Sequence, residues 1–393
     1  MNKGLTVLFV LLIFNFFAKA QPKLSPSSEV SVLTCAPGDE LYSTFGHSAI
    51  RVKDDSRRMD LVYNYGTFDF NTPNFYIKFT QGKLDYMLSI SPYKYYIRGY
   101  IRDKREVREQ ILNLSNSQKQ AVFDYLENNA RPENKFYHYD FLFNNCATKV
   151  IEVLLESVPD SIITGQASLG QNTSFRLMLS NSYLQEKKWT RTGINLLMGL
   201  PADATVSGTK ASFLPDYLES LISNTKIRRN GKLISIVKTE KVLYSPESKA
   251  DNKSGILSPG FIFWSLLTLI ILLTGLEFVK KQHFIEFDRY LLATLGLAGI
   301  LFTYTWFGTM HKAMAINLNT IWAFPLHVVA AFILTKQNYS KIVKIYFKVY
   351  FILLISFLTY LIINPTFFDP IVLPVTLILL VRSFSYFRWK MVN

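Results

Sequence analysis

The sequence has few of the residues on which common metal and nucleotide sites depend. It contains only two cysteines and five histidines in 393 residues. Only His47 and His138 fall within the first 250 residues, and they form no closely spaced ligand pair, so no metal site is predicted. Glycine-rich phosphate loops and Gly-x-Ser-x-Gly elbows are also lacking, which argues against nucleotide binding and against a serine hydrolase. No cofactor is expected.

Acidic residues are scarce as well, at 29 against 43 basic residues, and the formal net charge is +14. A nucleic-acid-binding protein would gather such an excess into one basic patch. Here half of the excess lies beyond residue 250, where 12 Lys and Arg stand against 5 Asp and Glu. Those basic residues lie mainly between long apolar runs, as is usual in membrane proteins. No nucleic-acid partner is predicted.

The N-terminus has the features of a secretory signal. Lys3 provides a positive charge, residues 5–17 are apolar, and residues 18–20 form a small-x-small cleavage site. The apolar stretch is short for a membrane span, which needs ~20 residues. We therefore expect residues 1–20 to be a cleaved signal peptide, with an uncleaved anchor as the alternative.

Residues 21–250 have a globular composition and predict an exported α+β domain. Alternating apolar residues predict strands at 30–34, 48–52, 61–65 and 84–90, and amphipathic patterns predict helices at 115–128 and 147–158. Asn230 and Gly231, between two short alternating runs, predict a β-hairpin over residues 226–243. A polar linker follows at residues 245–255.

Five apolar segments after the linker predict an all-α bundle of five transmembrane helices over residues 256–390. The segments are residues 261–279, 290–307, 316–334, 345–363 and 367–381. The first four are close to the length that a bilayer requires. The fifth is shorter and contains Asp369 and Pro374, so its assignment rests on weaker grounds.

The distribution of charge predicts the orientation of these segments. If the signal is cleaved, the exported domain lies outside and the first span runs inward. The inner loops would then carry Lys280, Lys281, Arg289, Lys336, Lys341, Lys344, Arg382, Arg388 and Lys390. The outer loops would carry only Lys312, so the positive-inside rule predicts a cytoplasmic C-terminus. An even number of spans would place the C-terminal basic cluster outside and break the rule.

Cys146 is the candidate nucleophile. It follows Asn145, a favoured helix cap, at the start of the helix predicted from Ala147. The positive end of the helix dipole favours a thiolate, which is the form that attacks carbonyl carbons. The amides of the first turn, at Asn145 and Ala147, are candidates for binding an oxyanion. A buried structural cysteine, or a disulfide with Cys35, is compatible with the same pattern.

His47, after Gly46 at the head of a strand, is the candidate general base for Cys146. Asn64 on the returning strand is the candidate that orients the imidazole, ahead of Tyr65 and Asp69. A hydrogen-bonded histidine at a strand end is the alternative for His47. His138 and Asp140 are interpreted as structural or supporting residues near the cysteine.

Four polar residues lie near or within the third apolar segment: His311, Asn317, Asn319 and His327. Polar groups at such depth are costly and face protein or water. They predict either a lipid-headgroup or lipoprotein site, or hydrogen bonds between helices. His311 and His327 are separated by ~24 Å of ideal helix, so they share no site unless the helix breaks.

The order of these residues resembles a known fold. A histidine opening a hairpin, a polar residue on the return strand and an Asn-Cys pair at a helix start about 100 residues later resemble the circularly permuted papain-like fold. Lecithin–retinol acyltransferase and its phospholipid acyltransferase relatives have this arrangement. Those enzymes carry an acyl group from a phospholipid as a thioester on cysteine.

A longer series of motifs resembles the Lnb family, the lipoprotein N-acyltransferases of Bacteroides-type bacteria. The matching segments are residues 33–42, 45–47, 64–70, 79–86, 139–141, 145–148 and 213–215, together with His311 and residues 317–327 in the membrane part. The resemblance implies an inner-membrane protein with a periplasmic domain in which His47 and Cys146 are catalytic. It also implies membrane phospholipid as acyl donor and bacterial lipoproteins as acceptors. The assignment of Asn64 rests on strand alternation alone.

Two other functions remain open at this level. NlpC-type cell-wall amidases and peptidases share the papain-like fold, although a wall hydrolase needs only a tether rather than five spans. A non-enzymatic carrier of lipids or lipoproteins, with an inert cysteine, is the third possibility.

Overall fold

Seven strands form one antiparallel sheet in the computed structural model, which describes residues 22–159, 161–166, 173–247, 257–334 and 340–388. In spatial order they are β10 (Val237–Tyr244), β5 (Val107–Leu112), β1 (Glu29–Cys35), β2 (His47–Asp54), β3 (Met59–Thr67), β4 (Asp85–Pro92) and β6 (Phe136–His138). The four strands predicted from alternation are confirmed as β1 to β4. The predicted signal peptide and most of the predicted linker lie outside the described residues.

Both faces of the sheet are covered, as the alternation of apolar residues requires. On one face Val32, Ile50 and Tyr63 pack against helices α4 (Asn116–Asn129), α5 (Cys146–Ser157) and α8 (Pro215–Ser223). On the other face Leu33 and Val62 pack under α3 (Tyr93–Arg102). The sheet therefore holds α5, with Cys146 at its first turn, directly over β2 and β3.

The predicted hairpin is present, in a smaller sheet of β7 (Ile162–Ile163), β8 (Lys226–Arg229) and β9 (Lys232–Ser235). Asn230 and Gly231 have φ angles of 50° and 74°, as a tight two-residue turn between twisted strands requires. The rest of the predicted hairpin range is β10, which pairs instead with β5 in the large sheet.

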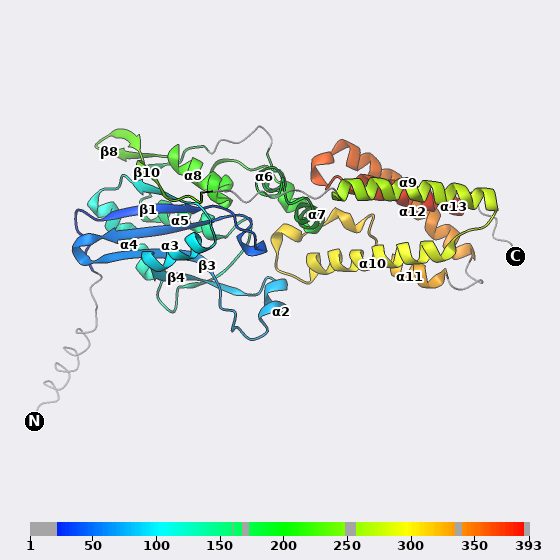
Figure 1. Cartoon of the computed structure of the whole chain (residues 1–393), viewed down its shortest axis with the longest axis horizontal. Helices are drawn as coiled ribbons and strands as arrows, with labels where there is room; N and C mark the ends of the chain where they lie inside the picture. The colour runs from blue at the N-terminus through cyan, green and yellow to red at the C-terminus, as the bar shows by residue number, and fades with distance from the viewer. Residues whose placement is uncertain (1–21, 160, 167–172, 248–256, 335–339, 389–393) are drawn as a thin grey trace, which may run out of the picture.

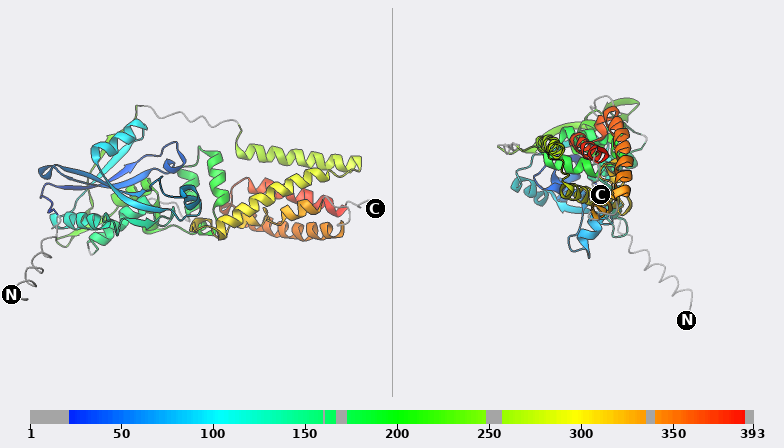
Figure 2. Two further views of the ribbon diagram at one scale, coloured as in Figure 1. Left: turned by 90° about the horizontal axis from the view of Figure 1, so that it is seen from below. Right: turned by 90° about the vertical axis from the view of Figure 1, so that its right-hand side faces the viewer.

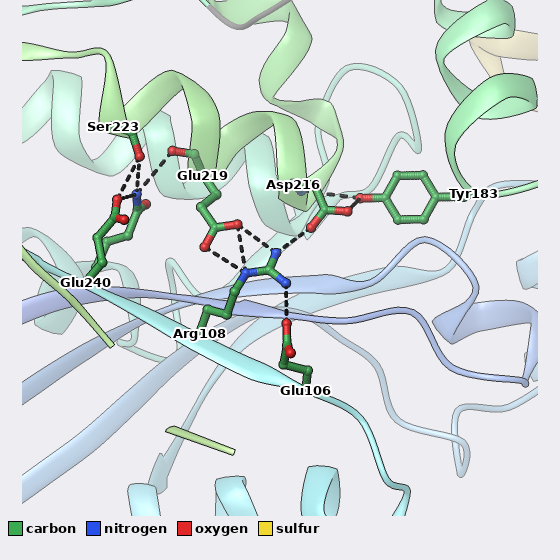
Figure 3. A network of polar contacts seen from close by, with 8 residues as sticks. Glu106, Arg108, Tyr183, Asp216, Glu219, Ser223 and Glu240 are labelled. Atoms are coloured by element: carbon green, nitrogen blue, oxygen red, sulfur yellow. Dashed lines mark hydrogen bonds and ion pairs between the residues drawn. The ribbon is translucent and has the colours of Figure 1, made fainter. Parts of the chain in front are cut away.

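A charged network fastens α8 to the large sheet (Figure 3). Arg108 of β5 donates to Glu219 and Asp216 of α8 at 2.6 Å each, and to Glu106 at 2.7 Å. The hydroxyl of Tyr183 donates to the other oxygen of Asp216 at 2.7 Å. In a half-buried network of this kind one ordered side chain makes several ion pairs, so the entropic cost per ion pair is smaller than for an isolated surface pair. It fixes the chain around residues 213–215, which lies beside the Cys146 helix.

The C-terminal part is a helical bundle that extends the molecule lengthwise (Figures 1 and 2). Its helices are α9 (Pro259–Lys280), α10 (Ile285–Phe307), α11 (His327–Ile333), α12 (Ser340–Ile363) and α13 (Val372–Arg388). Among the described residues, three helices are long and apolar enough to cross a membrane: Pro259–Lys280, Ile285–Phe307 and Lys341–Ile363. A shorter apolar helix covers Val372–Tyr386. Within the described residues the structure thus confirms three of the five predicted transmembrane helices by length and apolar composition.

The prediction of a single helix over residues 316–334 is wrong. The segment starts with a 3-10 turn (Leu318–Thr320) and irregular chain, and α11 begins only at His327. Pro325 lacks the amide that an interior helix position donates, and it disfavours helix at the residue before it. The irregular chain lies against α10, where a Cβ on Gly299 would stand 1.9 Å from the Ala323 carbonyl oxygen.

The irregular chain has its polar groups satisfied inside the protein, which is the condition for non-helical backbone at membrane depth. The Trp322 carbonyl accepts hydrogen bonds from Tyr350 at 2.7 Å and pairs with His327 Nε2 at 3.2 Å. The other ring nitrogen of His327 bonds the Tyr346 hydroxyl. The Trp322 indole donates to Asn319 at 2.9 Å. His327 and Asn319 thus take part in hydrogen bonds that hold the broken segment.

The sheet-containing part is hydrogen-bonded to the bundle through α7 (Lys188–Leu197), which lies between the two (Figure 1). Asn317 and Asn319 donate to the Leu196 carbonyl at 2.8 and 3.0 Å. Asp369 accepts from Thr192 and Asn195 at 3.2 Å each. These buried contacts explain why Asn317, Asn319 and Asp369 occur in apolar segments. They also place the start of α13 at the end of the bundle nearest the sheet.

The opposite end of the bundle holds a buried ion cluster. Arg382 of α13 pairs with Glu277 and Asp288 at 2.7 Å each, and all three side chains are nearly inaccessible. Arg382 was expected in a loop, but it is buried because two carboxylates surround it. Since α13 starts beside Asp369 and ends at this cluster, its last turns lie at the end farthest from the sheet (Figure 2).

The close contact at Gly299 gives a stability prediction. Gly299→Ala is expected to lower the thermal unfolding midpoint in detergent, because the new Cβ collides with backbone and overpacking costs ~1–3 kcal/mol. Gly275→Ala in α9 is the control, since a Cβ there meets nothing within 4 Å and alanine is the better helix former. An unchanged midpoint for Gly299→Ala would mean that the broken segment is not packed as described.

Candidate active site

Cys146 is the first residue of α5, and Asn145 positions it. The Asn145 side-chain oxygen accepts from the amides of Ala147 and Thr148 at 2.9 and 3.0 Å. The Thr148 hydroxyl accepts from the Asn145 amide at 2.7 Å, which completes a capping box. The Asn145 side-chain NH2 donates to the carbonyls of Phe141 and Phe213 at 2.7 Å each. Asn145 therefore joins the cysteine helix to the chain that Arg108 holds.

This capping limits which groups can bind an oxyanion. Both ends of the Asn145 amide are occupied, and the Ala147 amide already donates to it. The amide of Cys146 itself has no acceptor in the part of the chain that the structure describes, as is usual for the first amides of a helix. The Cys146 amide is thus a further candidate for the oxyanion role that the sequence predicts for Asn145 and Ala147.

His47 begins β2, and Asn64 lies on the neighbouring strand β3. Asn64 Oδ1 is 2.5 Å from His47 Nε2, so this nitrogen carries the proton that it donates, and Nδ1 is left for the thiol. The His47 and Cys146 side chains meet over Gly66. A Cβ on Gly66 would be 3.5 Å from Cys146 Cβ and 3.8 Å from His47 Cε1. The structure therefore brings together the three residues that the sequence proposed as a site.

The electrostatics of the pair bring the pKa values of Cys146 and His47 closer together. Burial alone would raise the pKa of Cys146, but the neighbouring His47 charge, its hydrogen bond and the amides of Ser48 and Ala147 lower that pKa below its ordinary value. Burial alone would lower the pKa of His47, whereas the Cys146 thiolate and the bonds to Cys146 and Asn64 raise it. A proton consequently moves from sulfur to imidazole more easily than between the isolated groups.

One tyrosine lies close to the thiol, and a second tyrosine stacks on it. Tyr139 approaches the same space over Gly66, at 3.9 Å from the Cβ position there, and its ring stacks on Tyr86 at 4.2 Å. Burial, with the negative charge of Cys146 next in importance, raises the pKa of Tyr139. Tyr139 therefore stays neutral and presents an aromatic ring beside the space that Cys146 and His47 share. Neither was identified from the sequence as a neighbour of the site, because sequence pattern does not show which segments converge on Cys146.

The remaining candidates lie away from the thiol. Asp140 accepts from the amides of Leu142 and Phe143 at 3.0 and 3.1 Å and so shapes the turn before α5. His138 is exposed on β6. Asp69 caps a turn in an exposed loop, and the Tyr65 hydroxyl accepts from Asn129 in the core. Asp140 thus supports the cysteine loop without reaching the sulfur.

Cys35 is a buried free thiol and forms no disulfide with Cys146. It lies opposite His47 in the β1–β2 register, and its sulfur is 3.3 Å from the Tyr96 hydroxyl. Burial raises the pKa of Cys35 to about 11, despite hydrogen bonds that oppose the change. Cys35 is therefore a neutral thiol at physiological pH. Within the described residues, no group of three or more His, Cys, Asp or Glu side chains is arranged to hold a metal ion.

The double role of Asn145 gives a second stability prediction. Asn145→Ala removes the cap and also leaves the buried Phe141 and Phe213 carbonyls without a donor, so a loss of ~2–4 kcal/mol is expected. Ser115→Ala, which uncaps α4 alone, should cost about 1 kcal/mol. Thermal unfolding of the two variants in detergent measures the difference. Equal losses would show that the bond to Phe213 contributes nothing.

Comparison with known families gives two matches that together cover most of the chain. Residues 16–181 match the family model of the Lnb N-terminal periplasmic domain. Residues 251–391 match the family model of the Lnb transmembrane domain. No curated protein and no solved structure matches the chain. The permuted papain-like fold accordingly stays a prediction, while an α+β unit with an antiparallel sheet followed by membrane helices is observed.

Proposed function

Because the chain belongs to the Lnb family, we propose that it is a lipoprotein N-acyltransferase that carries the acyl group as a thioester on Cys146. The family fits lipoprotein N-acylation in general terms and makes this an inner-membrane protein with a periplasmic N-terminal domain. The thiol mechanism, the phospholipid donor and the cytoplasmic C-terminus are proposals. The observation that supports the thiol mechanism best is the meeting of Cys146, His47 and Asn64 at the start of α5.

In the first half-reaction the thiol gives its proton to His47 Nδ1, and the thiolate attacks the ester carbonyl of a membrane phospholipid. The tetrahedral oxyanion lies within reach of the Cys146 amide at the positive end of the helix. His47 then returns the proton to the glycerol oxygen as the carbon–oxygen bond breaks. A lysophospholipid leaves, and the acyl group remains on sulfur.

In the second half-reaction the amino terminus of a diacylglyceryl-cysteine lipoprotein attacks the thioester. The amine must be neutral to attack, and His47 accepts the proton that it loses as the amide forms. The proton then passes to sulfur, which leaves as the restored thiol. Asn64 holds the imidazole in one orientation through both halves by accepting from Nε2. A membrane bundle suits such chemistry because the donor and the acceptor are both lipid-embedded.

Reconstitution tests this proposal directly. The purified full-length protein is placed in phospholipid vesicles with a synthetic diacylglyceryl-cysteine peptide, and the peptide mass is measured. The expected product carries one additional acyl chain on its N-terminal amine, and a peptide with a blocked amine gains none. If the peptide mass is unchanged in these vesicles, the N-acyltransferase proposal is rejected. Cleavage of added muropeptides by the same preparation would favour the cell-wall amidase or peptidase, and neither activity would favour a carrier.

A further inference from the structure

One lobe of the sheet-containing part exposes large apolar side chains to an unusual degree. The lobe consists of residues 68–82 and includes helix α2 (Phe75–Thr80); we call it the α2 lobe. Phe70, Tyr76, Ile77 and Phe79 are 66%, 79%, 57% and 43% exposed. Apolar groups clustered on a small element in this way mark a binding surface rather than ordinary surface.

The α2 lobe is fastened to the membrane bundle. The Met310 amide donates to the Gln81 carbonyl at 2.8 Å, and His311 Nε2 bonds the Phe79 carbonyl at 3.2 Å. Gly82 leaves room for the His311 ring, since a Cβ there would stand 3.1 Å from it. Met310 and His311 follow directly on α10, and α2 lies beside that end of α10 (Figure 1). The lobe is thus held where a membrane-crossing helix emerges.

The apolar surface continues from the lobe onto the bundle. Phe307 and Met310, on the chain that meets the lobe, are 72% and 51% exposed. An open apolar hollow of about 420 Å³ occurs at the same end of α10 and is lined by Ile300, Thr303, Tyr304, Phe307, Gly308 and Pro325. Since the bundle helices face lipid, the simplest occupant of a surface continuous with them is lipid as well. Aromatic side chains are favoured at this depth of a bilayer.

The α2 lobe is also connected to Cys146 by packed aromatic rings. Phe79 stacks on Phe75 at 6.1 Å, and Phe75 packs on Phe68 at 5.6 Å. Phe68 packs on Tyr86 at 5.3 Å, and Tyr86 stacks on Tyr139, which borders the thiol. An unbroken row of aromatic rings therefore runs from the α2 lobe to Tyr139, beside the space that Cys146 and His47 share.

We propose that the α2 lobe lies in the outer leaflet of the membrane and provides the apolar surface along which a phospholipid acyl chain reaches Cys146. The first part depends only on the exposed surface and its attachment to α10. The second part rests on the proposed acyl transfer. No bond is made or broken in this step. The lobe only guides the acyl chain out of the bilayer and shields it from water.

Depth-dependent quenching tests the first part. Tyr76→Cys in the full chain, with Cys35→Ala and Cys146→Ala to remove other thiols, is labelled with an environment-sensitive fluorophore and placed in vesicles containing nitroxide-labelled lipids. The label is expected to shift to shorter wavelength and to be quenched. Leu233→Cys is the matched control, since Leu233 is 49% exposed on the β8–β9 hairpin, which lies at the end of the molecule away from the bundle (Figure 1). An unquenched label at position 76 overturns the proposal. This holds also if a partner protein covers the α2 lobe and keeps the label away from lipid.

Donor selectivity tests the second part. Acylation of Cys146 is measured by intact mass with vesicle phospholipid and with a short-chain, water-soluble thioester. In Tyr76→Ser with Ile77→Ser, the ratio of the phospholipid rate to the soluble-donor rate is expected to fall at least tenfold. Leu233→Ser should leave the ratio unchanged, and an unchanged ratio in the double variant overturns the path. If neither donor acylates the wild-type cysteine while position 76 is quenched, the acyl transfer fails and the membrane contact stands.

Discussion

Cys146→Ala is expected to abolish lipoprotein N-acylation, with a loss of about 10³-fold or more, because no other group can carry the acyl chain. The measurement is the mass of lipoprotein N-terminal peptides from cells in which this protein is the sole N-acyltransferase. Free N-termini should replace acylated ones. The loss should come without a fall in the amount of membrane-inserted protein, since alanine keeps the Cβ of a residue that is only partly buried against the core.

Cys35→Ala is the matched control for this experiment. Cys35 is also a free thiol, and it lies opposite His47 in the sheet, but it is fully buried and its raised pKa keeps it protonated. N-acylation should continue in this variant at a rate close to that of the wild type. Normal N-acylation in Cys146→Ala would reject the thioester mechanism, and equal losses in the two variants would point to damage to the fold.

His47→Gln is expected to slow acyl transfer by ~10²–10⁴-fold and to move the pH dependence of the thiol. In the wild type the lowered pKa of Cys146 keeps the thiolate present below the pH at which an ordinary thiol ionises. Without the imidazolium, burial dominates and the pKa rises, so the thiolate appears only at higher pH. The profile of Cys146 alkylation by iodoacetamide, in a Cys35→Ala background, should therefore shift upward.

His138→Gln serves as the control for the histidine experiment. His138 is exposed on β6, and its main-chain carbonyl rather than its ring accepts the bond from Asn144. The pH profile of Cys146 alkylation in His138→Gln should coincide with that of the wild type. A His47→Gln profile that also coincides would show that His47 does not set the ionisation of Cys146, and the general base would have to be sought elsewhere.

The local parts of the fold were predictable because their signals lie within a few residues. Asn145 caps its helix as expected, since its side chain reaches the amides two and three residues ahead. Asn230-Gly231 makes its turn for a similarly local reason. Strands β1 to β4 followed from alternation, because one-residue shifts would turn their apolar side chains outward.

The parts that were missed depend on partners far along the chain. The break before His327 is accommodated by glycines in α10, and nothing in residues 316–334 reveals that contact. Strand β10 joins β5 across more than 120 residues, and α2 and α3 lie in an aromatic-rich stretch without clear periodicity. Asp369 made the assignment of the fifth predicted span less firm. In the structure this side chain is accommodated because it accepts hydrogen bonds from α7 at the end of the bundle.

In the candidate site, too, the residues with local sequence signals were predicted, and those placed by distant segments were missed. His47, Asn64 and Cys146 were proposed from strand order and helix capping, and the structure brings their side chains together, although their catalytic roles stay predictions. Tyr139 and Gly66 could not be found, because their nearness to the sulfur arises only when β3, β6 and α5 converge. Asn145 was expected to assist an oxyanion, but its second partner, Phe213, comes from a distant segment.

The most direct test of a covalent role for Cys146 is to look for the acyl group on its sulfur. The full-length protein is incubated with phospholipid in the absence of a lipoprotein acceptor, quenched in acid and measured as an intact mass, with peptide mapping to locate any adduct. The thioester mechanism predicts a mass increase of one acyl chain on Cys146, which hydroxylamine removes and which Cys146→Ala lacks. An unmodified Cys146 in a preparation that still transfers acyl groups to lipoprotein amines would contradict it.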